Sequence, residues 1–125
     1  MPQITLEHSA NLQPERPWTN LLGHLHDQIA GLSGIDIDTC KSRVVTLDKY
    51  RVGDGAEDKA FAHLTIRIFA GRSPAVKTEL GRAGLALLKR HLADAGDGLD
   101  IQLTVEIRDI DREAYFKERL TSTRP

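Results

Sequence analysis

The chemistry that this chain could perform begins with Pro2, its second residue. Methionine aminopeptidase is expected to remove Met1 in front of so small a residue, which leaves a free secondary amine at the head of a predicted strand. The pKa of an α-amino group is about 7.7–8.0, and burial near a cation lowers it toward neutrality. A neutral amine at pH 7 is a competent general base, and its protonated form can return the proton elsewhere. With Met1 attached, Pro2 has no basic nitrogen.

Three basic residues form the second group of candidates. Arg72 precedes Ser73 and Pro74, a pair expected to cap a helix and to occupy its first turn. Its guanidinium therefore lies beside the positive end of a helix dipole, which suits an anionic ligand. Lys41 and Arg43 are one alternation apart on a predicted strand and point to the same side. Together the three could bind two or more carboxylates. The plainer interpretation is an exposed arginine and a solvated strand edge.

Histidine and cysteine residues offer little further chemistry. His63 lies in the middle of a predicted strand, where a neighbour on the sheet is expected to satisfy it. The other four histidines show no metal-ligand spacing with acidic or sulfur partners. Cys40 is the only cysteine and cannot form an internal disulfide, so its expected role is packing. We therefore expect no metal site.

Apolar periodicity predicts the elements that must position these residues. Helical spacings of three, four and seven follow Pro17 and Pro74, and end near Gly34 and Gly96. Strands are predicted over residues 3–7, 43–52, 60–69 and 101–108, where apolar and polar or β-branched residues alternate. The turn-forming segment Gly53-Asp54-Gly55 predicts that the second and third strands form a hairpin. The result is an α+β fold with the order β-α-β-β-α-β.

Two helices on one face of a four-stranded sheet would bury the apolar side of each strand. The opposite face would carry Thr5, His63, Thr65, Arg67, Thr104 and Glu106. A solvated polar face is one explanation of that pattern. A subunit interface is the other, because four strands still leave edges that proteins tend to pair or protect.

Length, composition and net charge limit the number of domains and the kinds of partner that this chain can have. A chain of 125 residues that is 40% apolar suits one domain over residues 1–125, with a core over 2–109 and a polar C-terminal arm over 110–125. In that arm only Ile110, Tyr115, Phe116 and Leu120 could act as anchors. The net charge is −1, which gives no global field to attract nucleic acid or an anionic membrane. No apolar run approaches the roughly 20 residues of a membrane span and no signal-peptide pattern is present, so we expect a cytoplasmic protein.

Several motifs carry a resemblance to a known family. They are PQITLEHSANL after Met1, SRV at 42–44, DG at 54–55, AFAHLTIRI at 60–68 and AGRS at 70–73. The spacing AF-x-H-x-T-x-x-I-x-AGRS behind an N-terminal proline is similar to that of the 5-carboxymethyl-2-hydroxymuconate Δ-isomerase family, within the tautomerase superfamily. The likeness extends from Pro2 to about Phe116.

This resemblance implies a tautomerase fold in a homotrimer, with helices outside and sheets facing inward, and catalysis without a cofactor. The implied reaction is ketonisation of 5-carboxymethyl-2-hydroxymuconate or a similar 2-hydroxymuconate in the breakdown of aromatic acids such as homoprotocatechuate. Pro2 would move the proton from the 2-hydroxyl to C5, and Arg72 would hold a substrate carboxylate. Lys41 stands where the family often has Arg, and it keeps the charge without the bidentate fork.

Two alternatives stay open at this point. A non-catalytic, ferredoxin-like ligand-binding or interaction module has the same element order. The tautomerase scaffold also hosts dehalogenation and decarboxylation. On the leading interpretation the partners are a small carboxylate substrate and two further copies of the chain, with no nucleic acid and no membrane.

Overall fold

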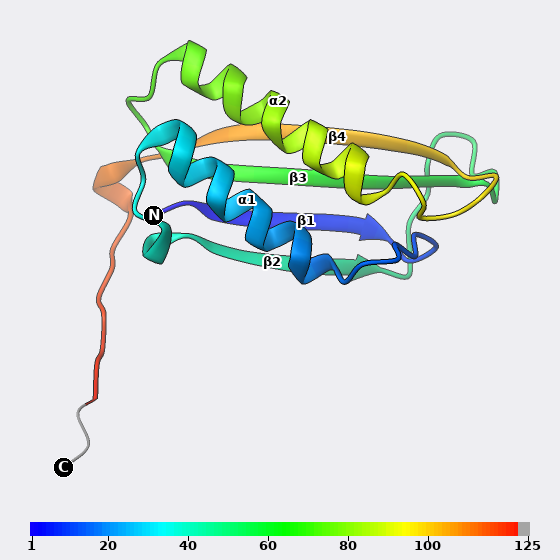
Figure 1. Ribbon diagram of the computed structural model, residues 1–125, viewed down its shortest axis with the longest axis horizontal. Coiled ribbons are helices and arrows are strands. Elements are labelled where there is room, and N and C mark those ends of the chain that lie inside the picture. Colours follow the sequence, from blue (N-terminus) through cyan, green and yellow to red (C-terminus); the bar gives the residue numbers. More distant parts are fainter. Residues whose placement is uncertain (123–125) are drawn as a thin grey trace.

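Two α-helices cover one face of a four-stranded sheet in the computed structural model, which describes residues 1–122 (Figure 1). The strand order is β2-β1-β3-β4, with β1 parallel to β2, antiparallel to β3, and β3 parallel to β4. The order β-α-β-β-α-β predicted from the sequence is confirmed. The elements are β1 (Gln3–Ser9), α1 (Trp18–Ser33), β2 (Lys41–Leu47), β3 (Lys59–Phe69), α2 (Pro74–His91) and β4 (Asp100–Ile110), with short 3₁₀ turns at Ile37–Thr39 and Arg112–Ala114.

The predicted hairpin between β2 and β3 is wrong, because β1 lies between these two strands. Gln3 of β1 pairs with Lys41 of β2 on one side and with Arg67 of β3 on the other. Strand β2 ends at Leu47, and residues 48–58 form a connection rather than strand. A turn motif reports only the local reversal of the chain. Each parallel pair is joined through a helix, and these two halves meet antiparallel along β1 and β3.

Helix α2 begins as its sequence predicts. The Ser73 hydroxyl accepts a hydrogen bond from the backbone N–H of Val76 at 3.3 Å, and Pro74 occupies the first turn. Its end differs from the prediction: the helix stops at His91, because the backbone of Leu92 turns out of the helix (φ −101°, ψ 5°), well before Gly96. Basic residues in the last turn complement the negative end of the helix dipole.

The core lies between the sheet and the helices. Every second residue of β1 and β3 faces the helices, and Ile4, Leu6, Leu64, Ile66 and Ile68 are each at most 1% exposed. The alternate residues form the open face of the sheet, where register aligns Thr5 with Thr65, Thr65 with Glu106, and His63 with Thr104. His63 Nδ1 lies 2.6 Å from Thr104 Oγ1, which confirms a structural partner for this histidine.

After β4 the chain leaves the body of the molecule as an extended arm (Figure 1). Ile110 is 6% exposed, and Tyr115 is half-buried with its ring edge-on to Phe69, so these two predicted anchors are confirmed. Phe116 and Leu120 are 88% and 90% exposed, so they do not anchor the arm within one chain. Residues 123–125 of the predicted arm lie outside the described part. Neither α-helix of the described chain has the length and apolarity needed to cross a membrane.

Candidate functional site

Pro2 lies directly before β1, at the end of the sheet where β2 begins and β3 finishes (Figure 1). Its carbonyl accepts a hydrogen bond from the backbone N–H of Lys41 at 3.1 Å, which ties it to β2. The residue is less than 2% exposed. Because side chains alternate along a strand, Pro2 shares with Ile4 the side of the sheet that faces the helices. The Met1 ammonium donates a hydrogen bond to Thr39 Oγ1 at 2.8 Å.

The amino terminus at this place is partly withdrawn from water. Burial lowers the pKa of the Met1 ammonium below its ordinary value of 8.0; Cys40 opposes that shift, and the positive charges of Lys41 and Lys117 add to it. Removal of Met1 would leave the Pro2 amine one residue deeper in the same surroundings. Burial at this position therefore favours the neutral form of an amine.

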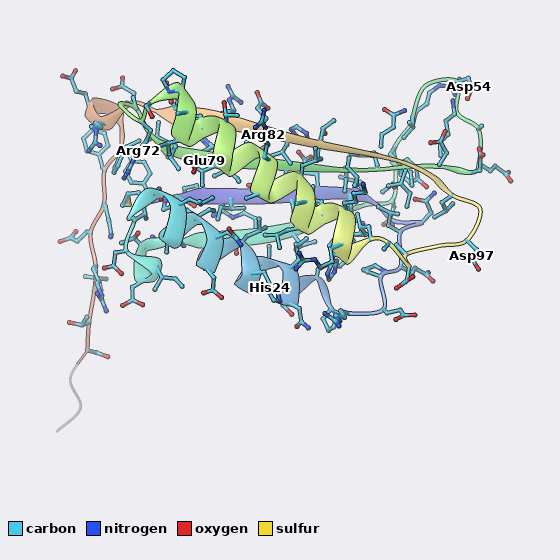
Figure 2. All side chains as sticks on the ribbon, turned by 45° about the horizontal axis from the view of Figure 1, so that its top comes forward. His24, Asp54, Arg72, Glu79, Arg82 and Asp97 are labelled. Atoms are coloured by element: carbon cyan, nitrogen blue, oxygen red, sulfur yellow. The ribbon has the colours of Figure 1, made fainter. Side chains whose placement is uncertain are left out.

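Arg72 comes to the same end of the molecule from the loop between β3 and α2 (Figure 2). Gly71 permits the turn with a φ of 112°, and the backbone N–H of Ala70 donates to the carbonyl of Ile110 at 3.0 Å. The half-buried Arg72 guanidinium donates to the carbonyl of Ser33, the last residue of α1. Contact with α1 places this guanidinium on the helix side of the sheet. Pro2 and Arg72 therefore share one end and one side of the sheet.

Lys41 and Arg43 lie on the open face instead. Lys41 pairs with Gln3 and Arg43 with Thr5, and both basic residues are exposed. Lys41 Nζ donates to the carbonyl of Thr39 at 2.9 Å, and the Arg43 guanidinium donates to the side-chain oxygen of Gln3. Within one chain, Pro2 and Arg72 share one end and one side of the sheet. Lys41 bonds to the Pro2 carbonyl through its backbone N–H, but its side chain lies on the open face with that of Arg43.

A cluster of polar and aromatic side chains beside this end was missed by sequence reasoning. Gln3 Nε2 donates to the Tyr115 hydroxyl at 3.0 Å, and the Tyr115 ring meets Phe69 edge-on with centroids 5.3 Å apart. The Arg112 guanidinium lies 4.6 Å from the centre of the Phe69 ring, within the range of a cation–π contact. This arrangement adds a further cation near the start of β1. No local pattern in the sequence relates residue 3 to residues 112–115.

An open depression of about 520 Å³ lies between the 3₁₀ turn after α1 and the C-terminal arm. Lys41 and Thr39 line it from one side, and Tyr115 and Phe116 line it from the arm. Pro2 and Arg72 are not part of its lining. The depression adjoins the amino terminus through Thr39, whose hydroxyl accepts the hydrogen bond of the Met1 ammonium, and through Lys41, whose charge lowers the pKa of that ammonium.

Solved structures place this fold in the tautomerase superfamily. A fused 4-OT described as a symmetric trimer aligns with a TM-score of 0.69 over 89% of this chain and 87% of that one; at 22% identity the likeness shows the fold alone. A 5-carboxymethyl-2-hydroxymuconate isomerase from Deinococcus radiodurans R1 aligns with a TM-score of 0.84 and 32% identity, over 95% of this chain and 90% of that one.

Sequence comparison identifies the family within this superfamily. The model of the 5-carboxymethyl-2-hydroxymuconate isomerase family matches residues 2–124, so Pro2 is the first residue matched. The 5-carboxymethyl-2-hydroxymuconate Delta-isomerase of Escherichia coli is 28% identical over 118 residues, which are 94% of this chain and 94% of that protein. The chain belongs to this family and is an isomerase. The resemblance found in the motifs is confirmed, and the non-catalytic module is no longer the competing interpretation.

Proposed function

We propose that this isomerase ketonises 5-carboxymethyl-2-hydroxymuconate or a similar 2-hydroxymuconate in the breakdown of aromatic acids, with Pro2 as general base and acid. One observation carries the proposal. The buried first residue of the family match and the guanidinium of Arg72 lie at one end of the sheet, on the side that faces the helices. A base and a carboxylate ligand are the two groups that the reaction needs.

The proton transfers balance without a cofactor. The neutral Pro2 amine accepts the proton of the substrate 2-hydroxyl, the double bonds shift, and the secondary ammonium delivers a proton to C5. Arg72 binds a substrate carboxylate and stabilises negative charge that develops on the substrate. Because a guanidinium has five N–H donors, the bond to the Ser33 carbonyl can orient Arg72 while other donors remain for the substrate.

We further propose that the chain works as a homotrimer in which the open face of the sheet packs against neighbouring chains. The β-branched and charged residues of that face, aligned across β1, β3 and β4, support this assembly. A neighbouring chain would then meet the side chains of Lys41 and Arg43, which in one chain lie on the open face and not on the helix side with Arg72. On this proposal the two residues bind a substrate carboxylate in an assembled site.

The decisive test compares two forms of the same sequence. Protein with Met1 removed and protein with Met1 retained, distinguished by intact mass, are assayed for ultraviolet-monitored ketonisation of 5-carboxymethyl-2-hydroxymuconate. We expect the Met1-free form to be about 10²–10⁴-fold faster, the usual contribution of a positioned general acid or base. Pro2→Ala in the Met1-free form should keep the fold and slow the reaction. Equal rates for the two forms would remove Pro2 from the mechanism.

The pH dependence of kcat/KM provides a second test of Pro2 as the base. Burial lowers the pKa of an amine at this terminus, and only the neutral amine is a base. The kcat/KM of the Met1-free protein should therefore rise with pH, with the midpoint of the rise below the ordinary α-amino pKa of about 7.7–8.0. A midpoint within or above that range would show an amine without the desolvation argued here.

A further inference from the structure

A second cavity, of about 310 Å³, lies between α1 and α2 at the end of the molecule remote from Pro2. Helix α1 begins at this end with Trp18, and α2 finishes there with His91 (Figure 1). No residue assigned to the isomerase site lines it. Arg16 contributes from the loop before α1, Asn20 and His24 from α1 itself, and Arg90 and His91 from the last turn of α2. Figure 2 shows His24 on α1, far from Arg72.

The basic side chains of this cavity are not occupied by ion pairs in the part of the chain that the structure describes. Within residues 1–122, neither Arg16 nor Arg90 takes part in an ion pair. His91 Nε2 is buried and makes no hydrogen bond in that part of the chain. Helix α1 has no acidic residue in its first turn, and Pro17 supplies no side-chain cap. The start of α1, where Asn20 lines the cavity, therefore has no acidic residue or side-chain cap of its own to complement the helix dipole.

The charge of the lining depends on its histidines. Glu15 and Asp94 also line the cavity and balance the two guanidinium groups, so protonation of His24 or His91 makes the lining positive. In the described part of the chain, no three His, Cys, Asp or Glu side chains come together to hold a metal ion. Two free guanidinium groups and an unpartnered imidazole nitrogen fit an anion better than a cation.

We propose that this cavity binds a small, doubly charged oxyanion between Arg16 and Arg90, with His91 taking up a proton and donating a hydrogen bond from Nε2. Guanidinium forks match the oxygen pairs of such an anion, and a charge-assisted bond would satisfy the buried imidazole nitrogen. Inorganic sulfate and a short dicarboxylate share this chemistry.

Binding and protonation are coupled by charge. Three effects lower the pKa of His91, namely burial and the nearby charges of Arg16 and His24, and a hydrogen bond with the Arg16 backbone works against them. An anion opposes all three effects and therefore favours the imidazolium. The remaining charged or titratable groups around His91 are Glu15, Arg90 and Asp94 from the lining, and His8, which stacks on Trp18. His8 is held by the carbonyl of Ser9 at 2.8 Å and the hydroxyl of Thr46 at 2.9 Å.

Trp18 reports the state of this cavity directly. It is the only tryptophan, and its ring centroid lies 5.2 Å from that of His91. A protonated imidazole in contact with an indole forms a cation–π pair and quenches indole fluorescence. At constant pH, an anion that favours protonated His91 should therefore lower the emission of Trp18.

The experiment titrates sodium sulfate, and separately malonate, into the full chain at about pH 6, below the ordinary histidine pKa of about 6.5, with ionic strength held constant by chloride. We expect a saturable fall in Trp18 emission, which His91→Gln abolishes. Arg90→Gln should weaken the apparent affinity at least about tenfold, the loss of one charge-assisted hydrogen bond. Asp94→Asn should strengthen it, because it removes a competing carboxylate.

Arg82→Gln is the matched control, since Arg82 is exposed on α2 and does not line the cavity (Figure 2). Saturation by sulfate alone would assign an inorganic ligand, and saturation by malonate would assign a dicarboxylate. A response without saturation, or equal responses in Arg90→Gln and Arg82→Gln, would overturn the proposal. Because no turnover is measured, the outcome is independent of the proposed isomerase function.

Discussion

At the scale of single residues, Met1 and Ser33 control the two groups of the proposed site. Met1 decides whether the nitrogen of Pro2 is an amide or an amine. The Ser33 carbonyl holds the Arg72 guanidinium at the start of α2. Both effects come from the backbone. The Met1 peptide bond precedes β1, and the Ser33 carbonyl lies at the end of α1. The chemistry of Pro2 and Arg72 therefore depends on how these elements meet.

Arg72→Ala tests whether the Arg72 guanidinium binds the substrate carboxylate. A charge-assisted hydrogen bond contributes about 1.5–3 kcal/mol, so kcat/KM for ketonisation should fall roughly 10- to 100-fold. The control is Arg82→Ala, which removes an exposed arginine from the middle of α2 and should leave kcat/KM unchanged. Steady-state kinetics on the Met1-free proteins measure both. An Arg72→Ala protein as active as Arg82→Ala would take Arg72 out of the site.

At the scale of elements, α2 packs on the sheet through glycine. A Cβ at Gly84 would lie 3.1 Å from Leu64 Cδ2, closer than side chains normally approach, and 3.4 Å from Val105 Cγ1. A Cβ at Gly81 would meet only Ile107, at 3.9 Å, which is ordinary contact. Gly84 therefore permits the helix to lie close to β3 and β4.

These two glycines form a matched pair of variants. Gly81→Ala should raise the free energy of unfolding by up to about 1 kcal/mol, because alanine favours the helix. Gly84→Ala has the same propensity gain but crowds Leu64, and overpacking costs about 1–3 kcal/mol. We expect Gly84→Ala to be the less stable of the two by about that amount in urea unfolding. Equal free energies of unfolding for the two variants would mean that Leu64 can move to accommodate the added methyl group without destabilising the core.

The elements were largely predictable because their causes are local. Apolar spacing marks α1 and α2, Ser73 and Pro74 mark a helix start, and alternation marks the strands. Which strand lies beside which is decided by packing between distant segments, so the turn at Gly53-Asp54-Gly55 led to a wrong pairing. For the same reason the sequence indicated Pro2 and Arg72 separately and gave no indication of Tyr115 beside Gln3. The 310 Å³ cavity joins the start of one helix to the end of another, which periodicity alone does not relate.

At the scale of the whole molecule, the helices leave one large surface without a covering layer. The open face of the sheet carries β-branched residues and charges, and both outer strands, β2 and β4, have a free edge within the described chain. The C-terminal arm extends from the same molecule with Phe116 and Leu120 exposed. Exposed edges and exposed large apolar side chains are features that proteins usually cover by association.

The proposed trimer therefore predicts a solution mass of three times the chain mass of 13.9 kDa, measured by light scattering or sedimentation. Thr65→Glu places a carboxylate on the open face directly opposite Glu106, so like charges would meet in the interface and the assembly should dissociate. Thr78→Glu makes the same change on the exposed side of α2 and should leave the mass unchanged.

The same two variants test whether Lys41 and Arg43 act in an assembled site. If they do, the KM for ketonisation should be higher for the dissociated Thr65→Glu protein and unchanged for Thr78→Glu. A folded Thr65→Glu protein that keeps the trimer mass would show that the open face is not the interface, and a monomeric wild type with full activity would show that one chain holds the whole site.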